Sequence, residues 1–200
     1  MPEAGEGRVI LVAGLSGAGK STFAERLCAA LAGAVHLPLD KYFLEVPASI
    51  TFRDWVQAPE SIDWPTLADH LRRLRAGDAC HTPAIDWRGS GRRLSAGGSV
   101  AHPGSREVRG GAGYYVVPGC FAFAAPLQSC LRVFVRAPLP VVAARCAARE
   151  VAADEVDHVL AEHSPGYPRI LAYESQADII VSGAERDEAE LARVCARISR

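Results

Sequence analysis

The sequence predicts an α/β fold in three layers, with a mostly parallel central sheet between two layers of helices. Short segments that are apolar throughout, which are typical of strands buried on both faces, alternate with helical patterns along the 200 residues. A glycine-rich segment also lies directly between the first such strand and the first such helix. The length and an apolar content of 49% predict one domain over residues 1–200 with a sizeable core.

Five apolar segments are expected to form the strands of this sheet, in chain order 8–13, 34–39, 114–117, 131–135 and 177–181. Four further segments are expected to form helices, at 20–31, 65–76, 139–151 and 187–198. Gly77 ends the second helix, and Pro140 lies in the first turn of the third, where proline is tolerated.

Residues 88–113 have a different composition, with eight glycines, five arginines and one acidic residue. We expect a small Gly/Arg-rich arm here, either a flap or a weak hairpin. Aromatic side chains that could stack on bases are not interleaved with the arginines, so a solvated flap is favoured over a nucleic-acid surface.

The charge and the cysteines limit the partners and the compartment. A net charge of −1 gives no general attraction to nucleic acid or to an anionic membrane. The six cysteines include no CxxC pair and are expected to be reduced thiols. The first residues, MPEAGEGR, lack the pattern of a signal peptide, and no apolar run approaches the ~20 residues of a membrane span. We therefore expect a cytoplasmic protein without nucleic-acid or membrane partners, while its oligomeric state, including a homo-oligomer, stays open.

The segment GLSGAGKS, residues 14–21, matches the Walker A pattern G-x-x-x-x-G-K-S in its required place between a strand and a helix. The glycines let successive backbone N–H groups face phosphate oxygens, and the start of the helix adds its positive dipole end. Lys20 can reach the β- and γ-phosphates, and Ser21 can place its hydroxyl on Mg²⁺. The motif predicts a P-loop that binds ATP with Mg²⁺, through Gly14, Ser16, Gly17, Ala18, Gly19, Lys20, Ser21 and Thr22.

Asp40 follows the second predicted strand, twenty residues after Lys20. In an open parallel sheet the ligand crevice lies beyond the carboxyl ends of the strands. Asp40 is therefore expected to face the phosphates from the acceptor side, where its carboxylate could orient an alcohol, accept its proton and lie near Mg²⁺. The alternative is an aspartate that only caps a turn.

Most of the chain, roughly residues 8–183, resembles the uridine kinase (uridine–cytidine kinase) branch of the P-loop kinases. The matching segments, in order, are GLSGAGKST, LDKYF, the stretch from VQAP to WRGSGR, the helix from residue 139 and QADIIVSG. The resemblance implies a P-loop kinase domain that phosphorylates a hydroxyl of a nucleoside or ribose-like small molecule. It also implies a lid-like region at residues 145–168.

The resemblance implies roles for individual side chains. Asp40 and Lys20 would be catalytic together with Arg149, while Arg145 would bind the ATP phosphates. Ser21 and Asp40 would hold the metal. The acceptor would meet Asp40, Phe43, Gln57, Asp86, Trp87 and Arg92. For three of these a plainer reading stays open: Phe43 as core, Asp86 as a turn cap and Arg92 as a solvated loop residue.

The chain departs from the family pattern in the acceptor pocket or metal site at Gln57, Ile85, Trp87, Ser90 and Pro118. It also departs in the lid, where Cys146 replaces one arginine and the arginines that usually follow are absent. Gln57 replaces an aspartate that holds ribose hydroxyls in the family, and Pro118 replaces the glutamate of a VEG element. One alternative is therefore a kinase of another alcohol: nicotinamide riboside (HSPGY at 163–167 is similar to the lid of its kinases), pantothenate or a specialised metabolite. The other is a nucleotide-binding regulatory protein that has lost catalysis, although the presence of both Lys20 and Asp40 favours a kinase.

Overall fold

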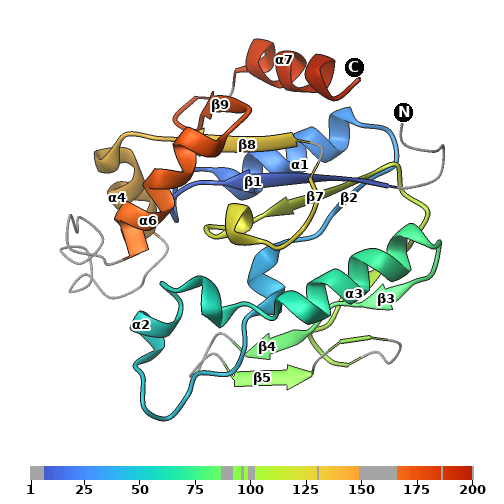
Figure 1. Ribbon diagram of the computed structural model, residues 1–200. Coiled ribbons are helices and arrows are strands. Elements are labelled where there is room, and N and C mark those ends of the chain that lie inside the picture. The colour runs from blue at the N-terminus through green and yellow to red at the C-terminus, as the bar shows by residue number, and fades with distance from the viewer. Residues whose placement is uncertain are drawn as a thin grey trace.

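The structure is a computed structural model that describes residues 7–86, 92–95, 97–98, 102–129, 131–148, 166–185 and 187–199. At 52–53, 86, 92–93 and 147 it describes the backbone alone. A parallel sheet of five strands forms the centre of the fold, which confirms the predicted class (Figure 1). The strands, in spatial order, are β2 (Ala34–His36), β7 (Tyr114–Pro118), β1 (Arg8–Ala13), β8 (Leu131–Arg136) and β9 (Ile179–Ser182).

The central strand β1 pairs in parallel with β7 on one side and with β8 on the other. The side chains of Ile10, Leu11 and Val12 are fully buried, because helices cover the sheet on both faces. This double burial explains why the strand is apolar throughout rather than alternating.

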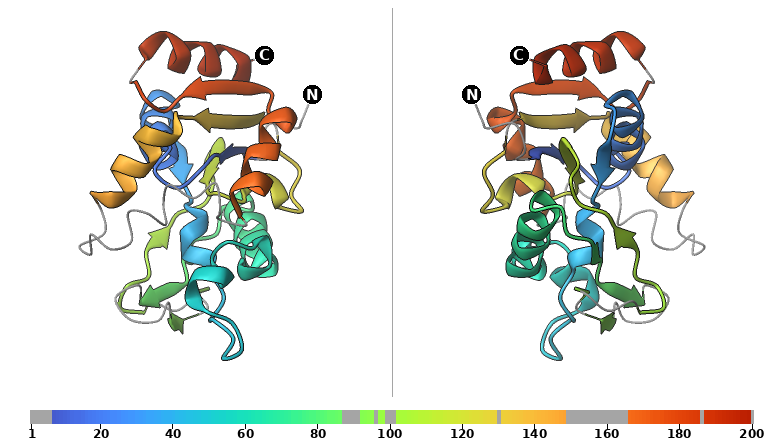
Figure 2. Two further views of the ribbon diagram at one scale, coloured as in Figure 1. Left: turned by 90° about the vertical axis from the view of Figure 1, so that its left-hand side faces the viewer. Right: turned by 90° about the vertical axis from the view of Figure 1, so that its right-hand side faces the viewer.

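Helices form the two outer layers, as Figure 2 shows. On one side of the sheet are α1 (Lys20–Ala30) and α4 (Leu139–Ala147), and on the other is α6 (Gly166–Ala172). The one-turn helix η5 (Tyr173–Gln176) follows α6, and η3 (Ala122–Ala124) follows β7. The last helix, α7 (Glu188–Ile198), lies beside β9 and contacts α1. The predicted helix at 139–151 is described only to residue 148, so its end lies outside the described residues.

A smaller group of elements lies below the five-stranded sheet in Figure 1. Its helices are η1 (Leu39–Tyr42), α2 (Phe52–Trp55), η2 (Pro59–Ser61) and α3 (Trp64–Arg75). Two antiparallel pairs accompany them, formed by β3 (Cys80–His81) with β6 (Glu107–Val108) and by β4 (Ala84–Asp86) with β5 (Arg92–Ser95). Both β5 and β6 come from the Gly/Arg-rich segment 88–113.

The second predicted strand, 34–39, is shorter than the sequence indicated. Strand β2 ends at His36, and only the backbone N–H of Leu37 still donates to Val116 O, at 2.8 Å. Pro38 has no N–H to continue the ladder, so the chain turns into η1. Asp40 therefore lies in a short helix after the strand, not at the strand end itself.

Among the helices that the structure describes, none has both the length and the apolar character of a membrane span.

Helix α3 supports η1 and begins at a side-chain cap. Asp63 Oδ1 accepts a hydrogen bond from Thr66 N at 3.0 Å, and Asp63 Oδ2 accepts one from Thr66 Oγ1 at 2.8 Å. Replacing an N-cap aspartate by alanine leaves backbone N–H groups without this partner. We expect Asp63→Ala to lower the free energy of unfolding by about 0.5–2 kcal/mol, measured by urea denaturation. The exposed Asp78, just beyond the other end of α3, supplies the control: Asp78→Ala should leave stability nearly unchanged. Equal losses in both variants would contradict the capping role.

Candidate functional site

The P-loop joins β1 to α1 and packs against the neighbouring strand and helix. Gly17 has a φ of 75°, in the left-handed region that favours glycine. A Cβ at this position would lie 2.8 Å from Val142 O and 2.9 Å from Cys146 Sγ, both in α4. The loop can therefore lie this close to α4 only because residue 17 has no side chain.

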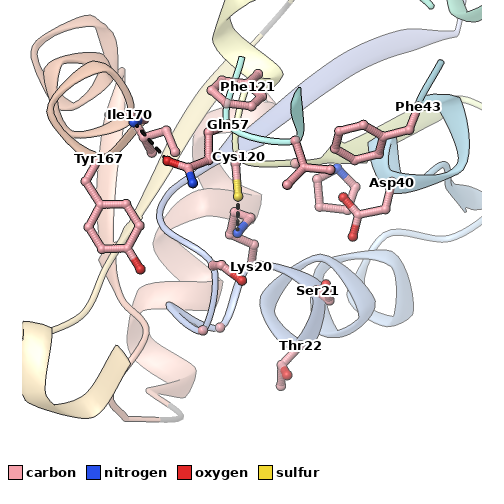
Figure 3. Close-up of a pocket in the computed structure, with 17 residues that line it drawn as sticks. Lys20, Ser21, Thr22, Asp40, Phe43, Gln57, Cys120, Phe121, Tyr167 and Ile170 are labelled. Carbon is pink, nitrogen blue, oxygen red and sulfur yellow. Dashed lines mark hydrogen bonds between the residues drawn. The ribbon is translucent and has the colours of Figure 1, made fainter. Parts of the chain in front are cut away.

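Lys20 is the first residue of α1, and its ammonium group turns back over the loop. Lys20 Nζ donates to Leu15 O at 2.8 Å and contacts Cys120 Sγ at 3.3 Å. Figure 3 shows Lys20 in the middle of the site, below Cys120. The loop and the turn after β7 thus hold the ammonium group from two sides.

A cavity of about 700 Å³ opens directly over Lys20. Five segments that are far apart in the sequence line it: the P-loop with the start of α1, η1, the residues after α2, the turn after β7, and α6 (Figure 3). The predicted residues that it brings together are Ser16, Gly17, Gly19, Lys20, Ser21, Thr22, Asp40, Phe43 and Gln57. Gly14 and Ala18 belong to the loop but do not line the cavity.

Asp40 is exposed on the wall of this cavity, on a turn that is anchored on both sides. Its neighbours Leu39 and Tyr42 are 1% and 0% exposed. Tyr42 Oη lies 3.0 Å from His70 Nδ1 of α3, and burial raises the pKa of Tyr42, which keeps the phenol protonated. The buried neighbours thus fix η1, while Asp40 and the following Phe43 face the cavity, as Figure 3 shows.

Gln57 lies on the opposite side of the cavity from Phe43 in Figure 3 and is held by α6. Gln57 Oε1 accepts a hydrogen bond from Gly166 N at 3.4 Å. Near it, Arg169 and Glu60 approach to 3.8 Å, although both are largely exposed and contribute little. The chain after α2 and the helix α6 thus meet along one wall.

Seven lining residues were not predicted from the sequence as contacts of the site: Val56, Gly119, Cys120, Phe121, Gly166, Tyr167 and Ile170. No motif marks them, since apolar residues of this kind are equally typical of a core. The HSPGY segment, which ends at Tyr167, was the one sequence feature that indicated a role for α6 in the site. Pro118, which stands where the family has the glutamate of its VEG element, also lines the cavity.

A second, smaller cavity of about 250 Å³ lies on the other side of the P-loop and includes Arg145. Arg145 Nη1 donates to Gly183 O at 2.6 Å and to Gly17 O at 3.3 Å. The guanidinium group therefore contacts backbone carbonyls of the P-loop and of the loop after β9. The two cavities share Gly17, Gly19 and Thr22.

The other predicted contacts lie at the edge of what the structure describes. Asp86 and Arg92 are paired residues of β4 and β5, described by their backbone only. Trp87 and Arg149 lie outside the described residues. Their proposed contacts with acceptor and phosphate stay predictions.

The five described cysteines are free thiols, and they differ in their surroundings. Burial raises the pKa of Cys28 to about 11, and it raises the pKa of Cys80 as well, whereas Cys120 lies on the wall of the large cavity. Because the thiolate is the reactive form and burial raises the pKa of Cys28, iodoacetamide at pH 8 should label Cys28 more slowly than in the urea-unfolded chain, as peptide mass spectrometry can measure. Labelling of Cys28 should rise roughly tenfold per pH unit from pH 8 to pH 10, since its raised pKa lies above this range. Cys28 labelled at pH 8 as fast as in the urea-unfolded chain would contradict this picture.

Comparisons with known proteins agree with this architecture. Residues 9–82 match the model of a family described as an AAA domain. No curated protein sequence matches the chain.

Three solved structures are similar to nearly the whole chain at low sequence identity. A candidate fructose transport system kinase from Silicibacter sp. TM1040 is 19% identical, with a TM-score of 0.66 over 90% of this chain and 92% of that one. A possible uridine kinase from Bacillus stearothermophilus is also 19% identical, with a TM-score of 0.55 over 90% of each chain. A phosphoribulokinase from Rhodobacter spheroides is 14% identical, with a TM-score of 0.57 over 90% of this chain and 71% of that one. The chain therefore shares the α/β fold of these three structures.

Proposed function

We propose that the chain is a kinase that transfers the γ-phosphoryl group of ATP to a hydroxyl of a small molecule, with a nucleoside or ribose-like compound as the first candidate. One observation carries the proposal: Lys20 and Ser21 of the P-loop line the same cavity as the Asp40 carboxylate, which comes from η1. A protein that only binds nucleotides does not need a carboxylate and a walled space beyond the phosphates. This juxtaposition therefore favours transfer over a purely regulatory role.

In this proposal each residue has a distinct role. The loop amides and Lys20 hold the phosphates and stabilise the negative charge that spreads over the transferring group. Asp40 orients the acceptor hydroxyl and accepts its proton. Cavity walls built from η1, the residues after α2, the turn after β7 and α6 keep the acceptor in place and exclude water.

The donor set fits Mg²⁺. Ser21 and Asp40 offer a hydroxyl and a carboxylate on the wall of one cavity, and both are hard oxygen ligands. Within the described part of the chain, no group of three or more His, Cys, Asp or Glu side chains could cage a metal. This agrees with Mg²⁺, which takes one or two protein ligands together with phosphate oxygens and waters. When bound, the ion would neutralise charge on the β- and γ-phosphates.

The second cavity is a suitable place for the base and ribose of ATP. It adjoins the P-loop and is lined by Arg145 and by the end of β9 with the residues that follow it, Ser182 to Glu185. In this proposal Arg145 borders the nucleoside end of ATP as well as its phosphates. Arg149 remains the candidate for contact with the transferring phosphoryl group.

A second candidate acceptor is an alcohol other than uridine or cytidine. On the acceptor side the cavity is lined by Phe43, Val56, Tyr167 and Ile170, and Gln57 contributes a side-chain amide. An amide in place of the family's aspartate cannot give a charge-assisted bond to ribose hydroxyls, which favours pantothenate or another alcohol that does not need this bond. Nicotinamide riboside, which has the same ribose as uridine, is a candidate because of the HSPGY segment at 163–167. The proposed partner is thus a small molecule in every case, and we propose no nucleic-acid or membrane partner.

The decisive experiment measures ADP release with Mg²⁺-ATP against uridine, cytidine, nicotinamide riboside and pantothenate. We expect one of these acceptors to stimulate release, and Asp40→Asn to lower the turnover of that reaction by roughly a hundredfold or more. ATP affinity should persist in this variant, because asparagine keeps an oxygen ligand for Mg²⁺ and the P-loop amides and Lys20 still hold the phosphates.

Asp78→Asn is the matched control, since Asp78 is an exposed aspartate outside the cavity, and it should retain full turnover. Transfer that survives in Asp40→Asn would contradict the role of this carboxylate. Tight ATP binding without release for any acceptor would instead favour the regulatory alternative.

A further inference from the structure

The contact between Lys20 and Cys120 joins the P-loop, which follows β1, to the turn after the neighbouring strand β7. Lys20 Nζ donates to Leu15 O at 2.8 Å and to Cys120 Sγ at 3.3 Å, and Figure 3 shows Cys120 directly above the end of Lys20. An ammonium group has three N–H donors. Two of them are thus directed at acceptors of the protein, and the geometry leaves one for the cavity above.

The position of Cys120 is fixed by the same strands that fix the P-loop. Gly119 N donates to Val12 O at 3.0 Å, which ties the turn after β7 to the strand that leads into the loop. A Cβ at residue 119 would lie 2.5 Å from Leu39 Cβ, so only glycine lets this turn pass so close to η1. The thiol therefore has a set place relative to Lys20 and to the turn that carries Asp40.

The chemistry of the thiol suits a partner of a phosphate-binding lysine. Sulfur is a weak hydrogen-bond acceptor, and a thiol has no formal charge. A carboxylate at the same point would form an ion pair with Lys20 and offset the charge that attracts phosphate. Pro118, at the end of β7, has no side-chain acceptor at all. Cys120 thus gives the ammonium group a directional contact and leaves its charge for a ligand.

We propose that Cys120 is a positioning residue for Lys20. With Leu15 O it holds the ammonium group on the floor of the cavity, so that the remaining N–H is directed at the triphosphate. The inference rests on the proposed function, because it takes Lys20 as the ligand of the ATP phosphates. It adds a residue that neither the P-loop motif nor the family resemblance marks.

The test is a double-mutant cycle on Mg²⁺-ATP affinity, measured by calorimetric titration up to millimolar ATP. Cys120→Ala should weaken binding about threefold to tenfold, as the loss of one weak hydrogen bond to a charged group would. Because Cys120 acts through Lys20, Cys120→Ala should cause no further loss in the Lys20→Ala background. A general packing defect would weaken both backgrounds equally.

Cys195→Ala is the matched control, because Cys195 is also half-buried but lies in α7. The affinity of the Cys195→Ala variant for Mg²⁺-ATP should equal that of the wild type. Thermal unfolding of each variant shows that the chain remains folded, and Cys120→Val, which fills the space without an acceptor, should match Cys120→Ala.

The outcomes separate the inference from the proposed function. If the wild type binds Mg²⁺-ATP and Lys20→Ala weakens it, an unchanged affinity in Cys120→Ala overturns the positioning role. Equal losses in both backgrounds overturn it too. If the wild type does not bind Mg²⁺-ATP, or Lys20→Ala binds it as well as the wild type, the P-loop assignment itself fails.

Discussion

The parallel pairing of β1 with both of its neighbours is the constraint on which the rest of the structure depends. Because β7 and β8 run in the same direction as β1, all three carboxyl ends lie at one edge of the sheet. The P-loop leaves that edge from β1, and the turn with Cys120 leaves it from β7. Lys20 can touch Cys120, a hundred residues later in the chain, only because the two strands are in register.

The turn that carries Asp40 also depends on the parallel sheet, through the strand β2 that leads into it. Pro38 stops the ladder of β2, so the chain bends across the end of β7 instead of continuing beside it. Leu39 then packs over Gly119, and Tyr42 meets His70 of α3. The buried residues on both sides of Asp40 hold its carboxylate toward the P-loop. Their contacts are with Gly119 and His70, which lie outside the LDKYF segment.

The far wall of the cavity depends on weaker contacts, which also join segments far apart in the sequence. Gln57 meets the first residue of α6, while Tyr167 and Ile170 of that helix face the same space. This wall is mostly apolar and carries one amide, whereas the P-loop wall offers amides, hydroxyls and a cation. The cavity thus has a polar floor for phosphates and a largely apolar side for the body of an acceptor.

The sequence by itself determined the elements whose chemistry is local. An apolar strand, a Walker A loop and a helix in succession predict a phosphate-binding loop, because spacing and backbone freedom are sufficient to build it. The same holds for the alternation that predicts the parallel sheet. Asp40 was predicted from its place after a strand. The turn that presents it depends on Pro38, which lies within the segment 34–39 that was predicted as a strand.

Only the tertiary structure decided which side chains share the cavity. Cys120, Phe121, Tyr167 and Ile170 have no motif, since an apolar residue looks the same in the sequence whether it faces the core or a ligand. Arg145 contacts backbone carbonyls of the P-loop and of the loop after β9 beside the second cavity, and its predicted contact with the ATP phosphates stays a prediction. These placements arise from strand register and helix packing between distant segments, and local sequence patterns do not encode such long-range contacts.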